Sequence, residues 1–184
     1  MKKHLLISIQ GPTASGKTNV AIQLAKCLDA EIISCDSRQF FKELKIGAAP
    51  PSDNELAEVK HHFIKHLNVT DIYNAGMFER DALNKLDELF TKNDVAVMVG
   101  GSGLYANAVL HGFDDLPTAD SKIRSDLNAI FEKKGIGILQ EELMQKDPTY
   151  FNQVDKENAH RLIRALEVIR QTGKPYSQLR SAQK

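Results

Sequence analysis

The residues with the clearest chemical capacity form a glycine-rich loop that satisfies the phosphate-binding pattern G-x-x-x-x-G-K-[ST]. Its glycines let the backbone wrap an anion, Lys17 supplies positive charge, and the hydroxyl of Thr18 can hold Mg²⁺. A turn that merely caps a helix is the alternative, but such a turn does not need Lys-Thr directly after the second glycine. The pattern predicts a phosphate site, and leaves open whether phosphate is transferred, hydrolysed or held as part of a leaving group. The loop consists of Gly11, Pro12, Thr13, Ala14, Ser15, Gly16, Lys17 and Thr18.

Two further polar clusters follow apolar runs that are typical of strands. Asp36-Ser37-Arg38-Gln39 follows residues 31–34, and Gly100-Gly101-Ser102-Gly103-Leu104-Tyr105 follows residues 95–99. Because a parallel sheet presents its ligands at the carboxyl ends of its strands, we expect both clusters near the phosphate loop. Asp36 could act as a general base, bind a metal or cap the next turn, and Ser102 could donate to a phosphate or an oxyanion.

These clusters need a sheet to position them, and the periodicity of the chain predicts one. Apolar runs alternate with helical patterns, which is typical of parallel strands joined by crossovers. The predicted fold class is therefore α/β: a P-loop NTPase-like parallel sheet flanked by helices. The expected strands cover 5–9, 31–34 and 95–99, and the expected helices include 20–28, a short helix capped by Ser52 or Asp53 and running through Val59, and 78–90.

The character of the chain changes near residue 114, where strand patterns stop and charged helical patterns begin. We predict a P-loop core domain over 1–113 and a mainly helical insertion segment over 114–184. In the helical segment, Arg161 and Arg164 lie opposite an apolar stripe, which predicts an exposed face for both. The helical patterns cover 123–131, 138–143 and 159–169, and the last is expected to end near 172–175 before a short tail.

Composition narrows the class of protein only modestly. The 184 residues carry 24 basic and 24 acidic side chains, so no global field attracts nucleic acid or an anionic membrane. With no segment of about 20 apolar residues and no secretory signal, we expect a cytoplasmic monomer that does not enter a membrane. Cys27 and Cys35 are too few for a disulfide framework, and both are interpreted as packing residues.

In order and spacing, the clusters resemble the tRNA dimethylallyltransferase family, also called tRNA isopentenyltransferases. The resemblance covers nearly the whole chain, and the combination of motifs is far more specific than any one of them. Its carriers are the octapeptide 11–18, Asp36-Ser37-Arg38-Gln39, His61-His62-Phe63-Ile64, Gly100-Gly101-Ser102-Gly103-Leu104-Tyr105, Leu116-Pro117-Thr118-Ala119-Asp120 and the run His160–Val168.

The resemblance implies transfer of a dimethylallyl group from dimethylallyl diphosphate to N6 of the adenosine beside the 3′ end of the anticodon. Asp36 matches the family aspartate that acts as base, which the chemistry needs because an adenine amine is poorly basic. Ser102 stands where the family usually has a threonine, so the hydroxyl is kept. Lys17, Mg²⁺ held by Thr18 and the loop amides would stabilise the departing diphosphate.

The resemblance also implies contacts with the anticodon stem-loop of tRNA. Residues 36–39 would line the pocket of the target base, which must leave its stack to react. Without the resemblance, the arginines of the helical segment would be interpreted as a solvated helix face. The implied tRNA contacts are Asp36, Ser37, Arg38, Gln39, Ser102, Arg124, His160, Arg161, Leu162, Ile163 and Arg164.

The remaining histidines and aromatic residues are not assigned to the reaction. His61-His62 and His66 lack carboxylate or cysteine partners at a spacing that suits a metal, so we do not predict a zinc site. Phe40-Phe41 and Tyr105 could stack on a base, but core packing is expected for part of this set. The family commonly has tyrosine at the position of Phe41, which lacks that hydroxyl.

Family members usually continue well beyond the equivalent of Lys184, so we expect a shortened chain with weakened or lost turnover. Three other functions remain open. A P-loop kinase would use the same loop, with Asp36 as a metal or substrate ligand. A transferase acting on free adenine nucleotides would use the same prenyl-transfer chemistry. A phosphate- or RNA-binding module would bind its ligand without catalysing a reaction. The arginines of the helical segment favour tRNA over a small acceptor.

Overall fold

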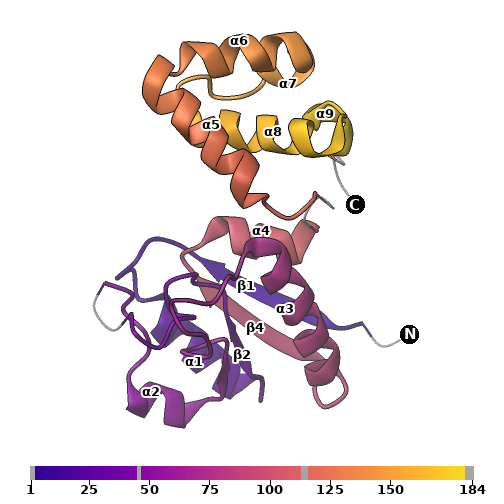
Figure 1. Ribbon diagram of the computed structural model, residues 1–184. Helices are drawn as coiled ribbons and strands as arrows, with labels where there is room; N and C mark the ends of the chain where they lie inside the picture. Colours follow the sequence, from indigo (N-terminus) through magenta and orange to yellow (C-terminus); the bar gives the residue numbers. More distant parts are fainter. Residues whose placement is uncertain (1–2, 45–46, 113–115, 181–184) are drawn as a thin grey trace. The chain divides into compact units, whose positions relative to one another are not determined.

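The structure is a computed structural model that describes residues 3–44, 47–112 and 116–180. The chain divides into two compact units, Met1–Phe113 and Asp114–Lys184. Within the described residues, the first unit contains all the strands, and the regular structure of the second is helical (Figure 1). Each unit has a hydrophobic core of its own, and each is described separately below.

The sheet of the first unit has the strand order β1-β4-β2-β3, and its paired strands are parallel. β1 and β4 are in register from the pair Leu5 and Val95 to the pair Gln10 and Gly100, so both end at one edge. The structure confirms the predicted parallel sheet flanked by helices and all three predicted strands; the short strand β3 was not predicted. The strands are β1 (Leu5–Gln10), β2 (Ile32–Ser34), β3 (His61–His62) and β4 (Val95–Gly100).

The alternation of side chains along β4 gives the sheet two packed faces. Val97 and Val99 pack in a cluster with α1, whereas Ala96 and Met98 pack in a cluster with α3 and α4. Because the strand is buried on both faces, its sequence reads as a continuous apolar run. The helices of this unit are α1 (Lys17–Cys27), α2 (Asp53–Glu58), α3 (Ala75–Phe90) and α4 (Gly103–His111).

The short helix α2 begins where the sequence predicts it. Ser52 is its N-cap and accepts from the backbone N–H of Glu55, whose carboxylate accepts in turn from the backbone N–H of Ser52 at 2.7 Å. This reciprocal capping box satisfies two donors that a helix start otherwise leaves open. Of the two predicted cap residues, Ser52 is therefore the one used.

The second unit is built around α8, whose side chains are buried from Leu162 through Ile169 except at Arg164. α8 packs against α5, α6 and α9. The carboxylate of Asp147, which is 1% exposed, caps α7 and accepts from the backbone N–H and hydroxyl of Ser177 at 2.7 and 2.8 Å. The helices are α5 (Ser121–Lys134), α6 (Gly137–Lys146), α7 (Pro148–Phe151), α8 (Ala159–Thr172) and α9 (Tyr176–Leu179).

Two expectations from the sequence need correction. Cys27 is exposed and is not a packing residue, whereas Cys35 lies in the core as expected. α8 does end at Thr172, and Gly173 follows it at φ 71°. The tail beyond it, however, contains the single turn α9, which is tied to Asp147 through Ser177.

Candidate functional site

The phosphate loop lies between the end of β1 and the start of α1. Gly16 precedes α1 at φ 81°, a left-handed conformation that glycine adopts without steric strain. The Lys17 ammonium folds back over the loop, donating to the carbonyl of Pro12 and lying 3.5 Å from Ser15 Oγ. The loop thus combines a helix N-terminus with a cation, the arrangement that binds phosphate.

A close approach of β4 to the end of β2 brings the second cluster beside this loop. A Cβ atom on Gly100 would lie 2.6 Å from both the carbonyl carbon and Sγ of Cys35, so only glycine fits there. A Cβ atom on Gly101 would lie 3.3 Å from Asp36 Oδ2 and 3.5 Å from the carbonyl oxygen of Gly11. The Asp36 carboxylate therefore lies at the start of the phosphate loop.

The two carboxylate oxygens of Asp36 have different surroundings. Oδ1 accepts from the backbone N–H of Arg38 at 3.1 Å, which fixes the orientation of the group. Oδ2 lies 3.3 Å from the position that a Cβ on Gly101 would take, and the Gly11 carbonyl oxygen of the phosphate loop lies 3.5 Å from that position. An oriented carboxylate with one oxygen turned toward a phosphate site is suited to act as a base there.

Ser102 links the third cluster to the second. It occupies the N-cap position of α4, but its side chain makes no cap bond. Instead its Oγ accepts from the backbone N–H of Ser37 at 3.0 Å and lies 3.1 Å from the hydroxyl oxygen of Ser37. The second and third polar clusters are thus in direct contact, and Gly101 of the third lies beside Gly11 of the phosphate loop.

The other members of the second cluster point in different directions. Arg38 is exposed. Gln39 uses its side-chain amide within the protein, donating to the carbonyls of Ala48 and Ala49 at 3.2 and 3.0 Å. Phe40, the next residue, is completely buried, which confirms that packing is its role.

An aromatic cluster packs around Phe40, which directly follows Asp36-Ser37-Arg38-Gln39. The ring of Phe40 contacts the rings of His66, Tyr73, Phe78 and Tyr105, with centroids 5.2 to 5.6 Å apart. Tyr105 belongs to α4, so the cluster ties the chain after β2 to the helix that follows Ser102. Tyr105 and the partly buried Phe41 thus pack against the core of this unit.

Cys35 is buried at this edge of the sheet and is not a candidate nucleophile. Burial raises the pKa of its thiol to about 11, although Gln10 Nε2 donates to the sulfur at 3.2 Å. A thiol with such a pKa stays protonated at neutral pH and is a poor nucleophile. Cys35 therefore packs β2 against β4 and takes no part in the chemistry.

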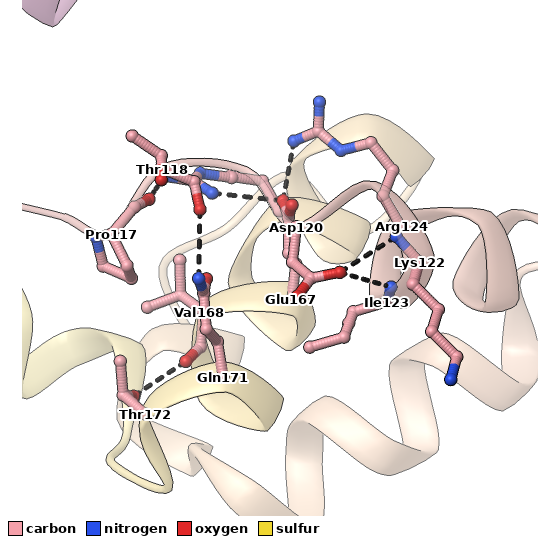
Figure 2. A network of polar contacts seen from close by, with 11 residues as sticks. Pro117, Thr118, Asp120, Lys122, Ile123, Arg124, Glu167, Val168, Gln171 and Thr172 are labelled. Carbon is pink, nitrogen blue, oxygen red and sulfur yellow. Dashed lines mark hydrogen bonds and ion pairs between the residues drawn. The ribbon is translucent and has the colours of Figure 1, made fainter.

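In the second unit, two of the three arginines expected at a tRNA surface, Arg124 and Arg164, bind a buried carboxylate, and Figure 2 shows Arg124 beside it. Glu167 is 0% exposed, and its Oε2 accepts from Arg124 Nη2 at 2.7 Å and from Arg164 Nη1 at 3.1 Å. Arg164 Nη2 also donates to the carbonyl of Pro117 at 2.8 Å. The side chain of Arg124 remains 44% exposed, whereas that of Arg164 is only 27% exposed.

These contacts correct the expectation of one exposed face on α8. Arg161 and His160 are exposed, but Arg164 is held between Glu167 and the chain segment before α5. Leu162 and Ile163 are 0% and 5% exposed and lie in the core of this unit. Their side chains are unavailable to an RNA, and we leave both out of the interface proposed below.

The histidines form no shared metal site in the described part of the chain. His61 Nδ1 lies 2.8 Å from the carbonyl of Val59, and His62 Nε2 lies 2.5 Å from Glu31 Oε2. Among the described residues, no group of three or more His, Cys, Asp or Glu side chains is placed to hold a metal ion. Nor does any helix in those residues have the length and apolarity that crossing a membrane requires.

Gly100 and Glu167 belong to quoted motifs, but the packing role of Gly100 in the first unit and the ion-pair role of Glu167 in the second were not predicted. Gly100 had a signal, because a glycine that directly follows a buried strand often marks a close backbone approach. Glu167 also had one: it is a charged residue within the apolar pattern of its helix, three residues after an arginine. The carbonyl acceptors at Pro117, Ala48 and Ala49 have no signal in the sequence.

Comparison with known proteins identifies the family. A model of the IPP transferase family matches residues 39–184. The tRNA dimethylallyltransferase of Christiangramia forsetii is 55% identical over 174 residues, covering 95% of this chain and 58% of that protein. The corresponding protein of Flavobacterium psychrophilum is 48% identical over 180 residues, covering 95% of this chain and 59% of that protein.

Solved structures agree with these sequence matches. The tRNA isopentenylpyrophosphate transferase of Bacillus halodurans has a TM-score of 0.59 and 36% identity, covering 96% of this chain and 58% of that one. A eukaryotic dimethylallyltransferase acting on tRNA has a TM-score of 0.79 and 25% identity, covering 99% of this chain and 45% of that one. These neighbours support the predicted P-loop NTPase-like fold.

The chain spans about 58% of the length of the curated relatives described above. Within that span it carries the phosphate loop, the Asp36 cluster and the helical unit with its arginines. The family match covers most of the chain, and the relatives match nearly all of it. The chain belongs to the IPP transferase family.

Proposed function

We propose that this protein transfers a dimethylallyl group from dimethylallyl diphosphate to N6 of the adenosine beside the 3′ end of the anticodon in tRNA. One observation carries the proposal: a fixed carboxylate lies beside a phosphate loop. Asp36 Oδ2 and the Gly11 carbonyl both lie within 3.5 Å of the position that a Cβ on Gly101 would take. In the proposed reaction, Asp36 would act as a base beside the leaving group of a prenyl diphosphate. The names of the relatives supply the substrate class.

The donor is expected to bind through its diphosphate in the loop 11–18. Negative charge develops on the bridging oxygen as the carbon–oxygen bond breaks, and loop amides with the Lys17 ammonium stabilise that charge. Lys17 already lies over the loop in this structure. Interactions that strengthen as the charge develops raise the rate of transfer rather than merely tightening donor binding.

The residues of the loop also fit a bound Mg²⁺. This ion takes oxygen ligands and usually reaches a protein through one or two groups plus substrate phosphates. The Thr18 hydroxyl at the start of α1 is the proposed protein ligand, and the phosphates of the donor would supply further oxygens. When bound, the ion would neutralise charge on the diphosphate.

The acceptor amine needs a base because its lone pair is delocalised into the adenine ring. We assign this role to Asp36, with Oδ2 as the accepting oxygen, because Oδ1 is already held by the N–H of Arg38. Ser102 is held beside this position by Ser37 and can donate its hydroxyl proton to substrate. The adenine must leave its stack to reach them, which is inexpensive in an anticodon loop.

The proposed tRNA contacts are those members of the predicted set that the structure leaves accessible. In the second unit these are Arg124, His160 and Arg161. In the first unit they are Asp36, Ser37, Arg38 and Ser102, which would surround the amine of a bound adenosine. Since tRNA is the proposed acceptor, we propose that the reaction takes place in the cytoplasm. We also propose that the protein is a monomer, and light scattering would test its oligomeric state.

Two binding titrations and one transfer assay test this function. Calorimetry with dimethylallyl diphosphate and with ATP, each with Mg²⁺, should show donor binding that Lys17→Ala abolishes and little binding of ATP. Preference for ATP would instead favour a kinase. Transfer to an anticodon stem-loop RNA should fall about 100- to 10,000-fold in Asp36→Asn, because that substitution removes the base and keeps the shape.

The matched control is Asp87→Asn, which changes an exposed carboxylate on α3. It should leave donor binding and transfer unchanged. Undiminished transfer in Asp36→Asn would remove Asp36 from the mechanism. If the unaltered chain binds RNA but neither donor nor ATP, it acts as a binding module and not as a transferase.

A further inference from the structure

Both N–H donors of the Gln39 side-chain amide form hydrogen bonds inside the protein. Its Nε2 donates to the carbonyls of Ala48 and Ala49 at 3.2 and 3.0 Å, and its Oε1 accepts from Ser34 Oγ at 3.0 Å. A side-chain amide has two N–H donors, so neither remains for a ligand. The backbone of Gln39 is committed as well, to Asp36 at 2.9 Å and to Lys65 at 2.8 Å.

Both chain segments that reach Gln39 are held in unfavourable backbone conformations. Ala49 has a φ of 41°, and Phe63 and Lys65 have φ of 64° and 48°. Residues with a side chain avoid this region, and they persist in it only where surrounding contacts hold them. For Ala49, one such contact is the hydrogen bond that Gln39 Nε2 donates to its carbonyl oxygen.

The anchor of this arrangement is a hydroxyl at the end of β2. Ser34 is 1% exposed, so its hydroxyl cannot reach a substrate. It fixes the amide of Gln39, which in turn holds the segment 47–50, where Ala48 is 4% exposed. A continuous path of hydrogen bonds thus runs from the sheet through Gln39 to a neighbouring loop segment.

We infer that Gln39 is a positioning residue, and not a tRNA contact: it fixes the segment 47–50 and the turn that carries Asp36 as one body on the sheet. The inference rests on the proposed function only for the substrate that binds near Asp36. The hydrogen bonds of Gln39 do not depend on that function. Gln39 therefore differs in role from Ser37 and Arg38, its neighbours in the same motif. Substitution of Gln39 should make the segment 47–50 open more readily even when no RNA is present.

The first test follows local opening of the segment without any substrate. Elastase cleaves after small residues, and we expect the bond after Ala48 to be protected while Gln39 binds the carbonyls of Ala48 and Ala49. Gln39→Met keeps the length of the side chain and removes its hydrogen bonds, so cleavage there should rise about tenfold or more. Arg38→Ala, the matched change at an exposed neighbour, should leave the rate unchanged.

Ser34→Ala gives a second, milder variant that retains Gln39. It should raise cleavage after Ala48 by a smaller factor, and it should add nothing when combined with Gln39→Met, because it acts through Gln39. Circular dichroism checks that each variant is folded. Unchanged cleavage in Gln39→Met, or equal acceleration by Arg38→Ala, would overturn the inference.

Binding of an anticodon stem-loop RNA separates positioning from contact. If Gln39 is a positioning residue, Ser34→Ala and Gln39→Met should either both change the affinity for RNA in the same direction or both leave it unchanged. Weaker binding in Gln39→Met with unchanged binding in Ser34→Ala would mark a direct contact and overturn the inference. An unaltered chain that binds no RNA counts against the proposed function alone, because the cleavage test needs no RNA.

Discussion

At the level of single residues, the site depends on the missing side chain of Gly100. We expect Gly100→Ala to destabilise the first unit by about 1–3 kcal/mol, because a new methyl group would meet the backbone of Cys35 at 2.6 Å. Neither backbone can move without disturbing the pairing of β2 with β4. Urea unfolding followed by circular dichroism measures the change.

Gly103→Ala is the control for this substitution. A Cβ at Gly103 has no neighbour within 4 Å, and the residue begins α4, where alanine is the better helix former. This variant should be as stable as the parent or slightly more so. Equal stability of the two variants would show that the contact at Gly100 relaxes freely.

Individual residues of the site differ in how far the sequence could predict their roles. Asp36, Ser102 and the loop 11–18 were found because parallel strands must end at one edge, and the structure places all of them there. The inward roles of Gln39 and Arg164 were not found, because their acceptors are backbone carbonyls of distant segments. Every residue has a carbonyl, so the sequence does not mark such partners.

At the level of elements, α8 separates two arginines that a helical wheel treats as equivalent. Arg161→Ala should weaken binding of an anticodon stem-loop RNA and lower the slope of log affinity against log salt by about 1. Its guanidinium is exposed on the first turn of α8, so the fold should keep its stability. Filter binding at several salt concentrations measures the slope.

Arg164→Ala is the internal comparison and should behave in the opposite way. Losing its bonds to Glu167 and to the Pro117 carbonyl should destabilise the second unit by about 1–3 kcal/mol, since Glu167 stays buried. The salt slope should change less than in Arg161→Ala. An unchanged slope in Arg161→Ala would remove that residue from the interface.

Element length explains which elements could be predicted from the sequence. α3, α5 and α8 each repeat an apolar pattern over several turns, and their predicted positions are confirmed. The strand β3 is two histidines, and α7 and α9 are single turns, so none offers a repeat to detect. These short elements form through tertiary contacts, such as the bonds of Asp147 to Ser177.

For the whole molecule, the two units divide the proposed work between them. The phosphate loop, Asp36 and Ser102 all belong to the unit Met1–Phe113, whereas Arg124, His160 and Arg161 belong to Asp114–Lys184. Each unit buries its own apolar cluster, and the polar contacts described for each lie within it. This division predicts that donor binding and RNA binding can be separated by cutting the chain.

A fragment of residues 1–112 should bind dimethylallyl diphosphate with Mg²⁺ within about tenfold of the 184-residue chain, because every proposed donor contact is retained. It should lose most of its affinity for the anticodon stem-loop, together with the salt dependence that Arg124 and Arg161 contribute. Calorimetry and filter binding on the fragment test both halves, after circular dichroism has shown that it folds. Lys17→Ala in the fragment is the control for donor binding. A folded fragment that binds no diphosphate would show that residues beyond 112 help to form the donor site, and undiminished RNA affinity would place the tRNA surface on the first unit.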